Sequence, residues 1–231
     1  MPVEGLVLWD VDKTLVDVSG VSRDIYAVAF ERVVGRPLGE LAEMTGRTEH
    51  AILVDTLALN GVAETKFDAF YEALGWAAHD LQDKMRVVGR ALPGAHQAIA
   101  VLRRDGMVQS VATGNIRSIA ETKLDAFDLA DGIDFEVGGY GSDGSVRSEL
   151  VRLARERTNA AYGVNLSPGS VVVIGDTPLD IEAAHGAGAR AVGVATGTST
   201  VGDLDRAGAD EVLDDLASAD AVAWAVYGKL L

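Results

Sequence analysis

The chain has 231 residues, of which 48% are hydrophobic and 24% are charged, a composition typical of a folded globular protein rather than a disordered one. Its formal net charge of −15 repels phosphate backbones and disfavours a nucleic-acid partner, and the absence of cysteine excludes disulfides, thiolate chemistry and cysteine-based metal sites. No apolar run approaches the roughly 18 residues that span a bilayer, and no basic leader with a cleavage site is visible. We therefore expect a soluble, cytoplasmic protein with no membrane partner.

The first predicted element is a short strand at residues 6–11, in which apolar residues follow one another without alternation. Such runs are typical of parallel strands that helices cover on both faces. Similar apolar runs, the last of them weaker, follow at residues 108–112, 171–174, 191–194 and 211–213.

Segments with helix-like spacing of apolar residues separate these runs, at residues 95–104, 116–127, 148–162 and 179–186. Strands that alternate with helices predict a doubly wound α/β fold, with a Rossmann-like parallel sheet and right-handed crossovers. The final segment, residues 218–231, carries Trp224 and Tyr227 at helical spacing. We expect it to dock on the sheet, but its apolar face could also serve a dimer, so a monomer and a homodimer both stay open.

Residues 19–88 interrupt this alternation, because they contain helix-like segments and no convincing buried strand. The helix-like segments lie at residues 23–34, 50–59 and 67–85. A stretch of this length is too long for one crossover. We therefore expect an all-helical cap subdomain at residues 19–88, inserted into an α/β catalytic core of residues 1–18 and 89–231. The hinges are expected near residues 16–20 and 88–94, and the alternative is a pair of crossover helices lying on the sheet.

Four carboxylates follow the predicted strands at the edge where the carboxyl ends of the strands meet. Asp10 and Asp12 follow the first strand, and Asp176 and Asp180 follow the strand at residues 171–174. Ligands bind at this edge in open α/β sheets, and four carboxylates gathered there require a cation. Oxygen ligands suit Mg²⁺ better than zinc, which favours histidine or cysteine. The sequence therefore predicts a Mg²⁺ cofactor, although any single aspartate here could instead be a helix cap.

Four motifs follow one another along the chain: Asp10-x-Asp12-x-Thr14, Thr113-Gly114-Asn115, Lys123, and Gly175-Asp176-x-x-x-Asp180. In order and spacing they resemble the haloacid dehalogenase superfamily. Over nearly the whole chain the sequence is similar to the phosphoglycolate-phosphatase-like branch, in which a helical cap follows the first motif. The resemblance implies Mg²⁺-dependent hydrolysis of a small phosphorylated metabolite through an aspartyl-phosphate, with phosphoglycolate as the candidate substrate.

The resemblance implies a role for each of the four aspartates. Asp10 is the expected nucleophile, and Asp12 is the expected general acid and base. The expected metal ligands are the Asp10 carboxylate, the Asp12 backbone carbonyl and Asp176, with Asp180 as a further ligand or as a residue that orients one. If the carboxyls of Asp10 and Asp12 face each other unscreened, one pKa rises, which suits acid–base chemistry.

Phosphate binding is expected from the second motif and from a lysine. The resemblance implies that Thr113, Gly114 and Asn115 bind phosphoryl oxygens and that Lys123 neutralises them. A phosphoryl dianion approaches a carboxylate cluster only where positive charge intervenes, which Lys123 and Mg²⁺ would supply. The alternative is that Lys123 is a solvated helix residue and Thr113 a turn residue.

Two other basic residues are notable. Lys13 occupies a position that is commonly glycine in the branch that the chain resembles, so we expect a turn that does not require a positive φ. We expect its ammonium to point to solvent or the cap rather than to the phosphate. Arg47, in the Gly-containing loop at residues 44–48, is a candidate for binding a substrate carboxylate or a second phosphate. Its alternative is a surface ion pair with Glu43 or Glu49.

Two other functions stay open. A sugar phosphomutase on the same scaffold would return the phosphoryl group to the substrate instead of losing it to water. Mutases that resemble this fold tend to lack an acid at the place of Asp180, which favours hydrolysis. A protein of another class, a catalytically silent metal-binding interaction protein, would bind Mg²⁺ without turning over a phosphoester.

Overall fold

The structure, a computed structural model, describes residues 3–18, 20–63, 67–103 and 106–228. The predicted start of the cap at residue 19, the predicted helix end at residue 104 and the last three residues lie outside this part. The helices are α1 (Val21–Val34), α2 (Glu49–Leu59), α3 (Phe67–Asp80), α4 (Gln82–Val88), α5 (Ala95–Val101), α6 (Arg117–Ala126), α7 (Arg147–Tyr162), α8 (Pro178–Gly186), α9 (Val201–Arg206) and α10 (Ala219–Tyr227). The strands are β1 (Gly5–Trp9), β2 (Val16–Asp17), β3 (Arg90–Ala91), β4 (Met107–Val111), β5 (Val171–Gly175), β6 (Arg190–Val194) and β7 (Glu211–Leu213).

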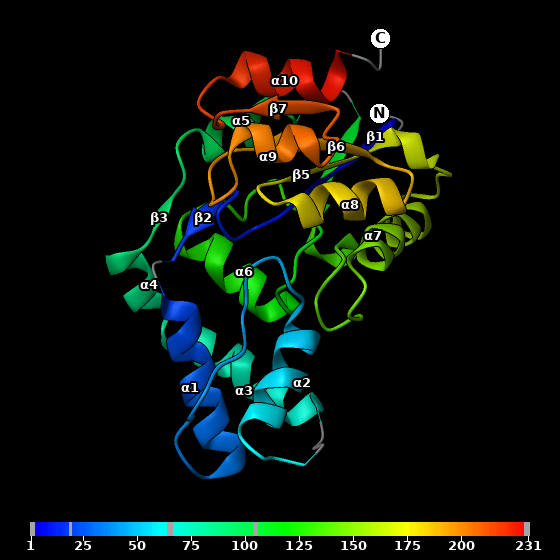
Figure 1. The fold of residues 1–231 in the computed structure, drawn as a ribbon. Helices are drawn as coiled ribbons and strands as arrows, with labels where there is room; N and C mark the ends of the chain where they lie inside the picture. The colour runs from blue at the N-terminus through cyan, green and yellow to red at the C-terminus, as the bar shows by residue number, and fades with distance from the viewer. Residues whose placement is uncertain (1–2, 19, 64–66, 104–105, 229–231) are drawn as a thin grey trace.

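A five-stranded parallel sheet forms the core, in the order β4-β1-β5-β6-β7 (Figure 1). On one side of β1, Leu8 is in register with Ser110 of β4, and on the other it is in register with Val173 of β5. The order reverses next to β1, because β4 lies on one side of it and β5, β6 and β7 lie on the other. The predicted doubly wound α/β fold is confirmed, and the weakest strand candidate, β7, is one of its two edge strands.

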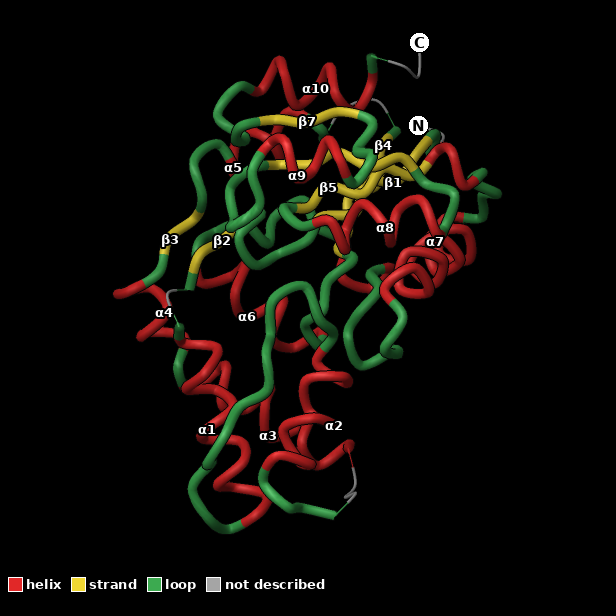
Figure 2. The backbone as a smooth tube through the Cα atoms, viewed as in Figure 1, coloured by secondary structure: helices red, strands yellow, loops and turns green. Residues whose placement is uncertain are grey.

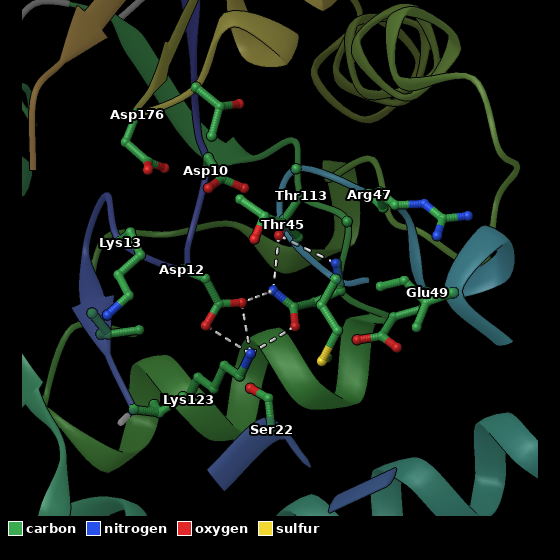
Figure 3. Close-up of a pocket in the computed structure, with 18 of the residues that line it drawn as sticks. Asp10, Asp12, Lys13, Ser22, Thr45, Arg47, Glu49, Thr113, Lys123 and Asp176 are labelled. Atoms are coloured by element: carbon green, nitrogen blue, oxygen red, sulfur yellow. Dashed lines mark hydrogen bonds and ion pairs between the residues drawn. The ribbon is translucent and has the colours of Figure 1, made fainter. Parts of the chain in front are cut away.

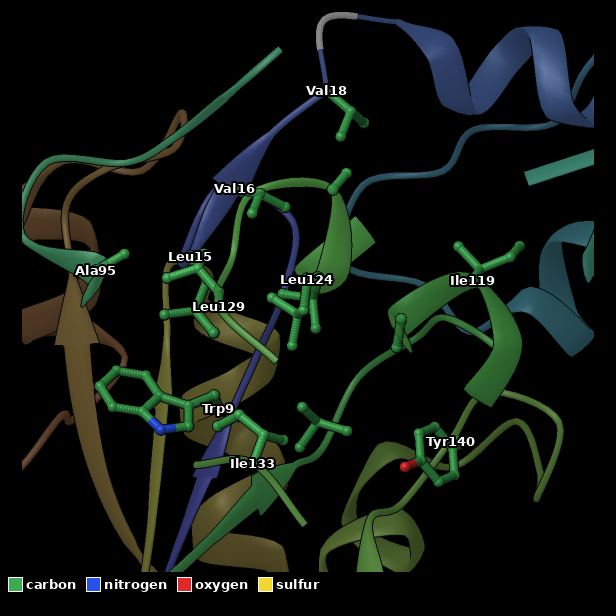
Figure 4. Close-up of a cluster of buried hydrophobic side chains, with 14 of the residues drawn as sticks. Trp9, Leu15, Val16, Val18, Ala95, Ile119, Leu124, Leu129, Ile133 and Tyr140 are labelled. Carbon is green, nitrogen blue, oxygen red and sulfur yellow. The ribbon is translucent and has the colours of Figure 1, made fainter. Parts of the chain in front are cut away.

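Alternate residues of β1 pack against opposite helical layers. Val7 and Trp9 belong to a cluster with residues of α5, α6 and α10, whereas Leu6 and Leu8 belong to a cluster with residues of α7, α8 and α9. In the backbone view, α5 and α10 lie on one side of the sheet, and α7 and α8 lie on the other (Figure 2). Trp9 is fully buried among apolar side chains (Figure 4), and its indole nitrogen donates to Gln109 Oε1 at 3.0 Å. Burial on both faces explains why the strand sequence is apolar without alternation.

The C-terminal helix α10 docks on the core, as predicted. It contacts α5 and β7, and it buries Val222, Ala225 and Val226. Trp224 is 58% exposed, so its indole is not part of this contact, and a dimer through this face stays a prediction. Within the described residues, no helix combines the length and apolarity needed to cross a membrane.

The described residues between β2 and β3 form the helices α1 to α4, which extend away from the sheet (Figure 1). A small apolar cluster of their own includes Phe30 of α1, Leu53 of α2 and Phe70 of α3. The helix expected over residues 67–85 is two helices, α3 and α4, because the chain turns at Leu81. The all-helical insertion therefore agrees with the predicted cap.

The two chain segments that connect the sheet to these helices pair with each other. Strands β2 and β3 pair antiparallel, with Val16 opposite Ala91 and Asp17 opposite Arg90. This two-stranded ribbon lies where the hinges are expected, and the proposed core and cap boundaries fall next to it.

The turn after β1 differs from the sequence prediction at Lys13. The φ of Lys13 is 65°, in the left-handed region, so the expectation that this turn needs no positive φ is wrong. The Lys13 N–H donates to the Val16 carbonyl at 2.7 Å, its ammonium donates to Asp17 Oδ1 at 2.6 Å, and its carbonyl accepts from Thr196 Oγ1 at 2.6 Å. These bonds offset the roughly 1–2 kcal/mol that a left-handed conformation costs a residue with a Cβ.

The left-handed turn predicts different stabilities for two variants at this position. Lys13→Gly and Lys13→Ala both remove the ammonium, but only glycine removes the steric cost of the Cβ. We expect the free energy of unfolding of Lys13→Gly, from urea denaturation, to exceed that of Lys13→Ala by about 1 kcal/mol. A less stable glycine variant would contradict this backbone conformation.

Candidate active site

One cavity of about 220 Å³ lies between the carboxyl edge of the sheet and the cap helices. The segments that follow β1, β4 and β5 meet there, because these three strands are neighbours in the sheet. Every residue that the sequence analysis assigned to the site lines this cavity: Asp10, Asp12, Arg47, Thr113, Gly114, Asn115, Lys123, Asp176 and Asp180.

Three buried carboxylates form the acidic side of the cavity. Asp10, Asp176 and Asp180 each offer an oxygen, and these oxygens lie within 4.8 Å of one another. Burial and the neighbouring carboxylate of Asp180 raise the pKa of Asp10 well above its usual range. The same two causes raise the pKa of Asp176 to about 7. Both shifts mean that the fully ionised cluster is costly unless a cation lies against it.

Arg147, which the sequence analysis missed, supplies one positive charge to this cluster. Its guanidinium donates to Asp180 Oδ1 and lies 3.5 Å from Asp10 Oδ1. Arg147 is the first residue of α7. No motif surrounds it, and only the need to balance four carboxylates pointed to a further buried cation.

Asp180 combines two tasks. Its Oδ2 accepts hydrogen bonds from the N–H of Thr177 at 3.0 Å and from the Thr177 hydroxyl at 2.7 Å, while its own N–H donates to Thr177 Oγ1 at 3.4 Å. This is a capping box at the start of α8, so the helix-cap alternative does hold for this aspartate. Since its other oxygen faces Arg147, the part of Asp180 in metal binding stays a prediction.

Asp176 is held by two segments far from it in the sequence. The Thr14 hydroxyl, which is fully buried, donates to Asp176 Oδ1 at 3.2 Å. The loop after β6 approaches so closely that a Cβ at Gly197 would lie 1.8 Å from Asp176 Oδ2. A side chain at this position would displace the Asp176 carboxylate from its present place, a constraint that the sequence analysis did not foresee.

Asp12 faces Lys123 and Asn115 rather than Asp10 (Figure 3). Lys123 Nζ donates to both Asp12 oxygens, at 2.8 and 2.6 Å, and to Asn115 Oδ1 at 2.8 Å, and Asn115 Nδ2 donates to Asp12 Oδ2 at 2.8 Å. The Lys123 side chain is only 2% exposed, so it is not a solvated helix lysine. Asp10 and Asp12 therefore do not form the unscreened pair considered from the sequence.

The loop after β4 joins the core to the cap. The buried Thr113 hydroxyl accepts from Asn115 Nδ2 at 2.9 Å. The Gly114 carbonyl accepts from the N–H of Glu49, the first residue of α2, at 2.7 Å. A Cβ at Gly114 would lie 2.0 Å from the Arg47 carbonyl oxygen, so glycine is required for the cap to dock this closely.

Arg47 lines the cavity, but its guanidinium already has partners. It donates to Asp55 Oδ2 at 2.6 Å and to the backbone carbonyls of Glu43 and Ala51, at 3.1 and 3.3 Å. The ion pair is therefore with Asp55, not with a carboxylate of Glu43 or Glu49, and the guanidinium points away from the acidic cluster (Figure 3). Binding of a substrate anion by Arg47 stays a prediction.

Glu49 is a second residue that the sequence analysis did not assign to the site. It lies in the cavity wall and is 4% exposed, and its carboxyl accepts a hydrogen bond from the Tyr26 hydroxyl. Burial raises its pKa to about 7. The sequence offered it only as an ion-pair partner for Arg47, because its burial depends on how the cap packs on the core.

Three solved structures illustrate the likeness to known folds. A hydrolase from Pseudomonas syringae is 24% identical, with a TM-score of 0.64, over 92% of this chain and 94% of that one. A predicted phosphatase from Clostridium acetobutylicum is 18% identical, with a TM-score of 0.60, over 93% and 95%. A Thermotoga maritima protein described provisionally as a β-phosphoglucomutase is 19% identical, with a TM-score of 0.57, over 98% of each chain. At these identities the likeness is one of fold.

No curated protein matches the sequence. A sequence model of haloacid dehalogenase-like hydrolases does match, over residues 7–185. The match begins in β1 and ends in α8, so it includes the cap and all four aspartates at the edge of the sheet. The superfamily resemblance of the motifs is thereby confirmed. The chain belongs to the haloacid dehalogenase-like hydrolase family.

Proposed function

We propose that this protein is a Mg²⁺-dependent phosphatase that hydrolyses the phosphomonoester of a small metabolite through an aspartyl-phosphate on Asp10. The observation that carries the proposal is the joint presence, in one cavity, of a buried carboxylate cluster and an aspartate held by a buried lysine. The cavity volume of about 220 Å³ favours a small substrate, since drug-sized ligands occupy pockets of roughly 300–1,000 Å³.

The residues of the acidic cluster fit Mg²⁺. Asp10 and Asp176 offer hard oxygen ligands, and their raised pKa values reflect a site where negative charge is in excess. The Asp12 backbone carbonyl is the further ligand that the family resemblance implies. When bound, Mg²⁺ would neutralise charge on the phosphoryl oxygens.

The chain's own residues would then divide the reaction into two displacements. In the first, the Asp10 carboxylate attacks phosphorus, the bond to the leaving oxygen breaks, and Asp12 gives that oxygen a proton. In the second, Asp12 takes a proton from water, which attacks the aspartyl-phosphate and releases phosphate and Asp10. Lys123 and Asn115 hold the Asp12 carboxyl in one orientation for both transfers.

Positive charge and hydrogen-bond donors lie around the proposed place of the phosphoryl group. Arg147, 3.5 Å from Asp10 Oδ1, supports the approach of a dianion to the nucleophile. Thr113 and Asn115 are proposed to bind phosphoryl oxygens. Lys123, proposed from the sequence as the counter-charge, instead contacts Asp12, so we propose that it acts mainly on the acid–base residue.

Phosphate release from a panel of phosphomonoesters tests this proposal. We expect release that needs Mg²⁺ and stops in EDTA, and a fall of about 10³-fold or more in kcat for Asp10→Asn, because the amide cannot form the covalent intermediate. The exposed Asp214→Asn is the matched control and should retain full activity.

Two other outcomes would overturn the phosphatase proposal. Isomerisation of a sugar phosphate without phosphate release would identify a phosphomutase. Mg²⁺ binding without either reaction would identify a silent metal-binding protein.

The raised pKa of Asp176 predicts a pH dependence of stability in the metal-free protein. Folding raises this pKa from 3.8 to about 7, so the folded state favours the protonated carboxyl. Its contribution to stability is present below about pH 4 and is lost as the pH rises through about 7. In EDTA, Asp176→Asn should therefore gain stability relative to wild type between about pH 5 and pH 8, by at least about 1 kcal/mol in urea unfolding. A relative loss of stability over that interval would contradict the assigned shift.

A further inference from the structure

The cap-side wall of the cavity contains a carboxyl group that the proposed mechanism does not use. Glu49 lies at the start of α2, and its carboxyl faces the cavity (Figure 3). Tyr26 donates to Oε2. Among the described residues, no donor contacts the other oxygen, Oε1. Glu49 lines the cavity, so Oε1 is an acceptor that a molecule bound there can reach.

Tyr26 fixes the direction of this acceptor. Burial, followed by the neighbouring Glu49, raises the pKa of the Tyr26 hydroxyl, which therefore stays a donor. Both side chains are nearly inaccessible to solvent, so the Glu49 carboxyl is held in place rather than free to turn toward water.

Glu49 lies on the side of the cavity where the leaving group is expected. The N–H of Glu49 donates to the Gly114 carbonyl at 2.7 Å. Asn115, which follows Gly114 in the chain, donates to Asp12 at 2.8 Å. The charges of Lys123 and Asp12 both act on the Glu49 carboxyl. Since Asp12 is the proposed proton donor to the leaving oxygen, a substrate bound there would bring the atoms attached to that oxygen next to Glu49.

The cavity offers no spare cation for an anionic leaving group. Each basic residue that lines it already pairs with a carboxylate, namely Lys13, Arg47, Lys123 and Arg147. A leaving-group carboxylate would enter this space beside Glu49 and lose its hydration without gaining an ion pair. A hydroxyl or an ammonium would instead donate to Oε1.

We propose that Glu49 is a specificity-determining residue that accepts a hydrogen bond from a hydroxyl or ammonium group of the leaving group. The substrate class is then the phosphomonoester of a small polyol, sugar or amino alcohol, and a carboxylate-bearing substrate such as phosphoglycolate is disfavoured. This inference rests on the proposed phosphatase function and adds the chemistry of the leaving group to it.

The test compares kcat/KM for substrates of similar size that differ in the leaving group. Glycerol 1-phosphate carries hydroxyls, phosphoethanolamine carries an ammonium, and phosphoglycolate carries a carboxylate. For wild type, we expect the better of the first two to exceed phosphoglycolate by about tenfold or more, the effect of one hydrogen bond to a charged group. Which of the two is better distinguishes a polyol from an amino-alcohol substrate.

Two variants test whether Glu49 causes this substrate preference. Glu49→Gln keeps the size of the side chain but removes its charge, and should lower the ratio of donor-bearing to carboxylate-bearing substrate by about tenfold. Glu72→Gln, an exposed cap residue on α3, should leave the ratio unchanged. Thermal unfolding of each variant verifies that it is folded.

Three results would overturn the inference, and they are distinguishable. Wild type that hydrolyses phosphoglycolate as well as the donor-bearing substrates would remove the proposed selectivity. An unchanged ratio in folded Glu49→Gln would assign the selectivity to another residue. Absence of phosphate release from every substrate would overturn the proposed phosphatase function itself, and the inference with it.

Discussion

Mutual repulsion among buried carboxylates is the constraint on which the rest of this site depends. Asp10, Asp176 and Asp180 bring oxygens within 4.8 Å of one another in a place that water barely reaches. Like charges at that distance and burial cannot all stay ionised without compensation. Arg147 supplies part of this compensation, because it pairs with Asp10 and Asp180. The remaining excess of negative charge makes the site suited to a cation.

The fold explains why this repulsion is tolerated. The strand order places the ends of β4 and β5 on either side of β1, so the residues that follow these three strands necessarily lie close together. Burial on both faces makes the sheet rigid enough to hold them there. Two of the three aspartates also have a separate anchor: Thr14 for Asp176, and the α8 cap for Asp180.

The cap contacts the core and supplies residues to the cavity wall. The start of α2 donates backbone hydrogen bonds to the core, from Glu49 to the Gly114 carbonyl at 2.7 Å and from His50 to the Gly141 carbonyl at 3.2 Å. The same contacts carry the Glu49 side chain into the cavity. The helix end that docks the cap on the core is therefore also the one that carries Glu49, the residue proposed to recognise the leaving group.

Much of this arrangement was predictable from the sequence, because it depends on local patterns. Apolar runs mark the strands, and aspartates at fixed spacing after them mark the edge where they converge. The contributions of Arg147 and Glu49 were not predictable, because each depends on packing between segments far apart in the chain. Lys13 was misjudged for a related reason: its left-handed φ is supported by Thr196, 183 residues away.

Calorimetric titration of Mg²⁺ into the metal-free protein tests the central claim that this carboxylate cluster is a cation site. The account predicts saturable binding at one site in wild type, and binding at least about tenfold weaker in Asp176→Asn, because that change removes a charged ligand. Absence of Mg²⁺ binding in wild type would mean that Arg147 alone balances the cluster, and would contradict the account.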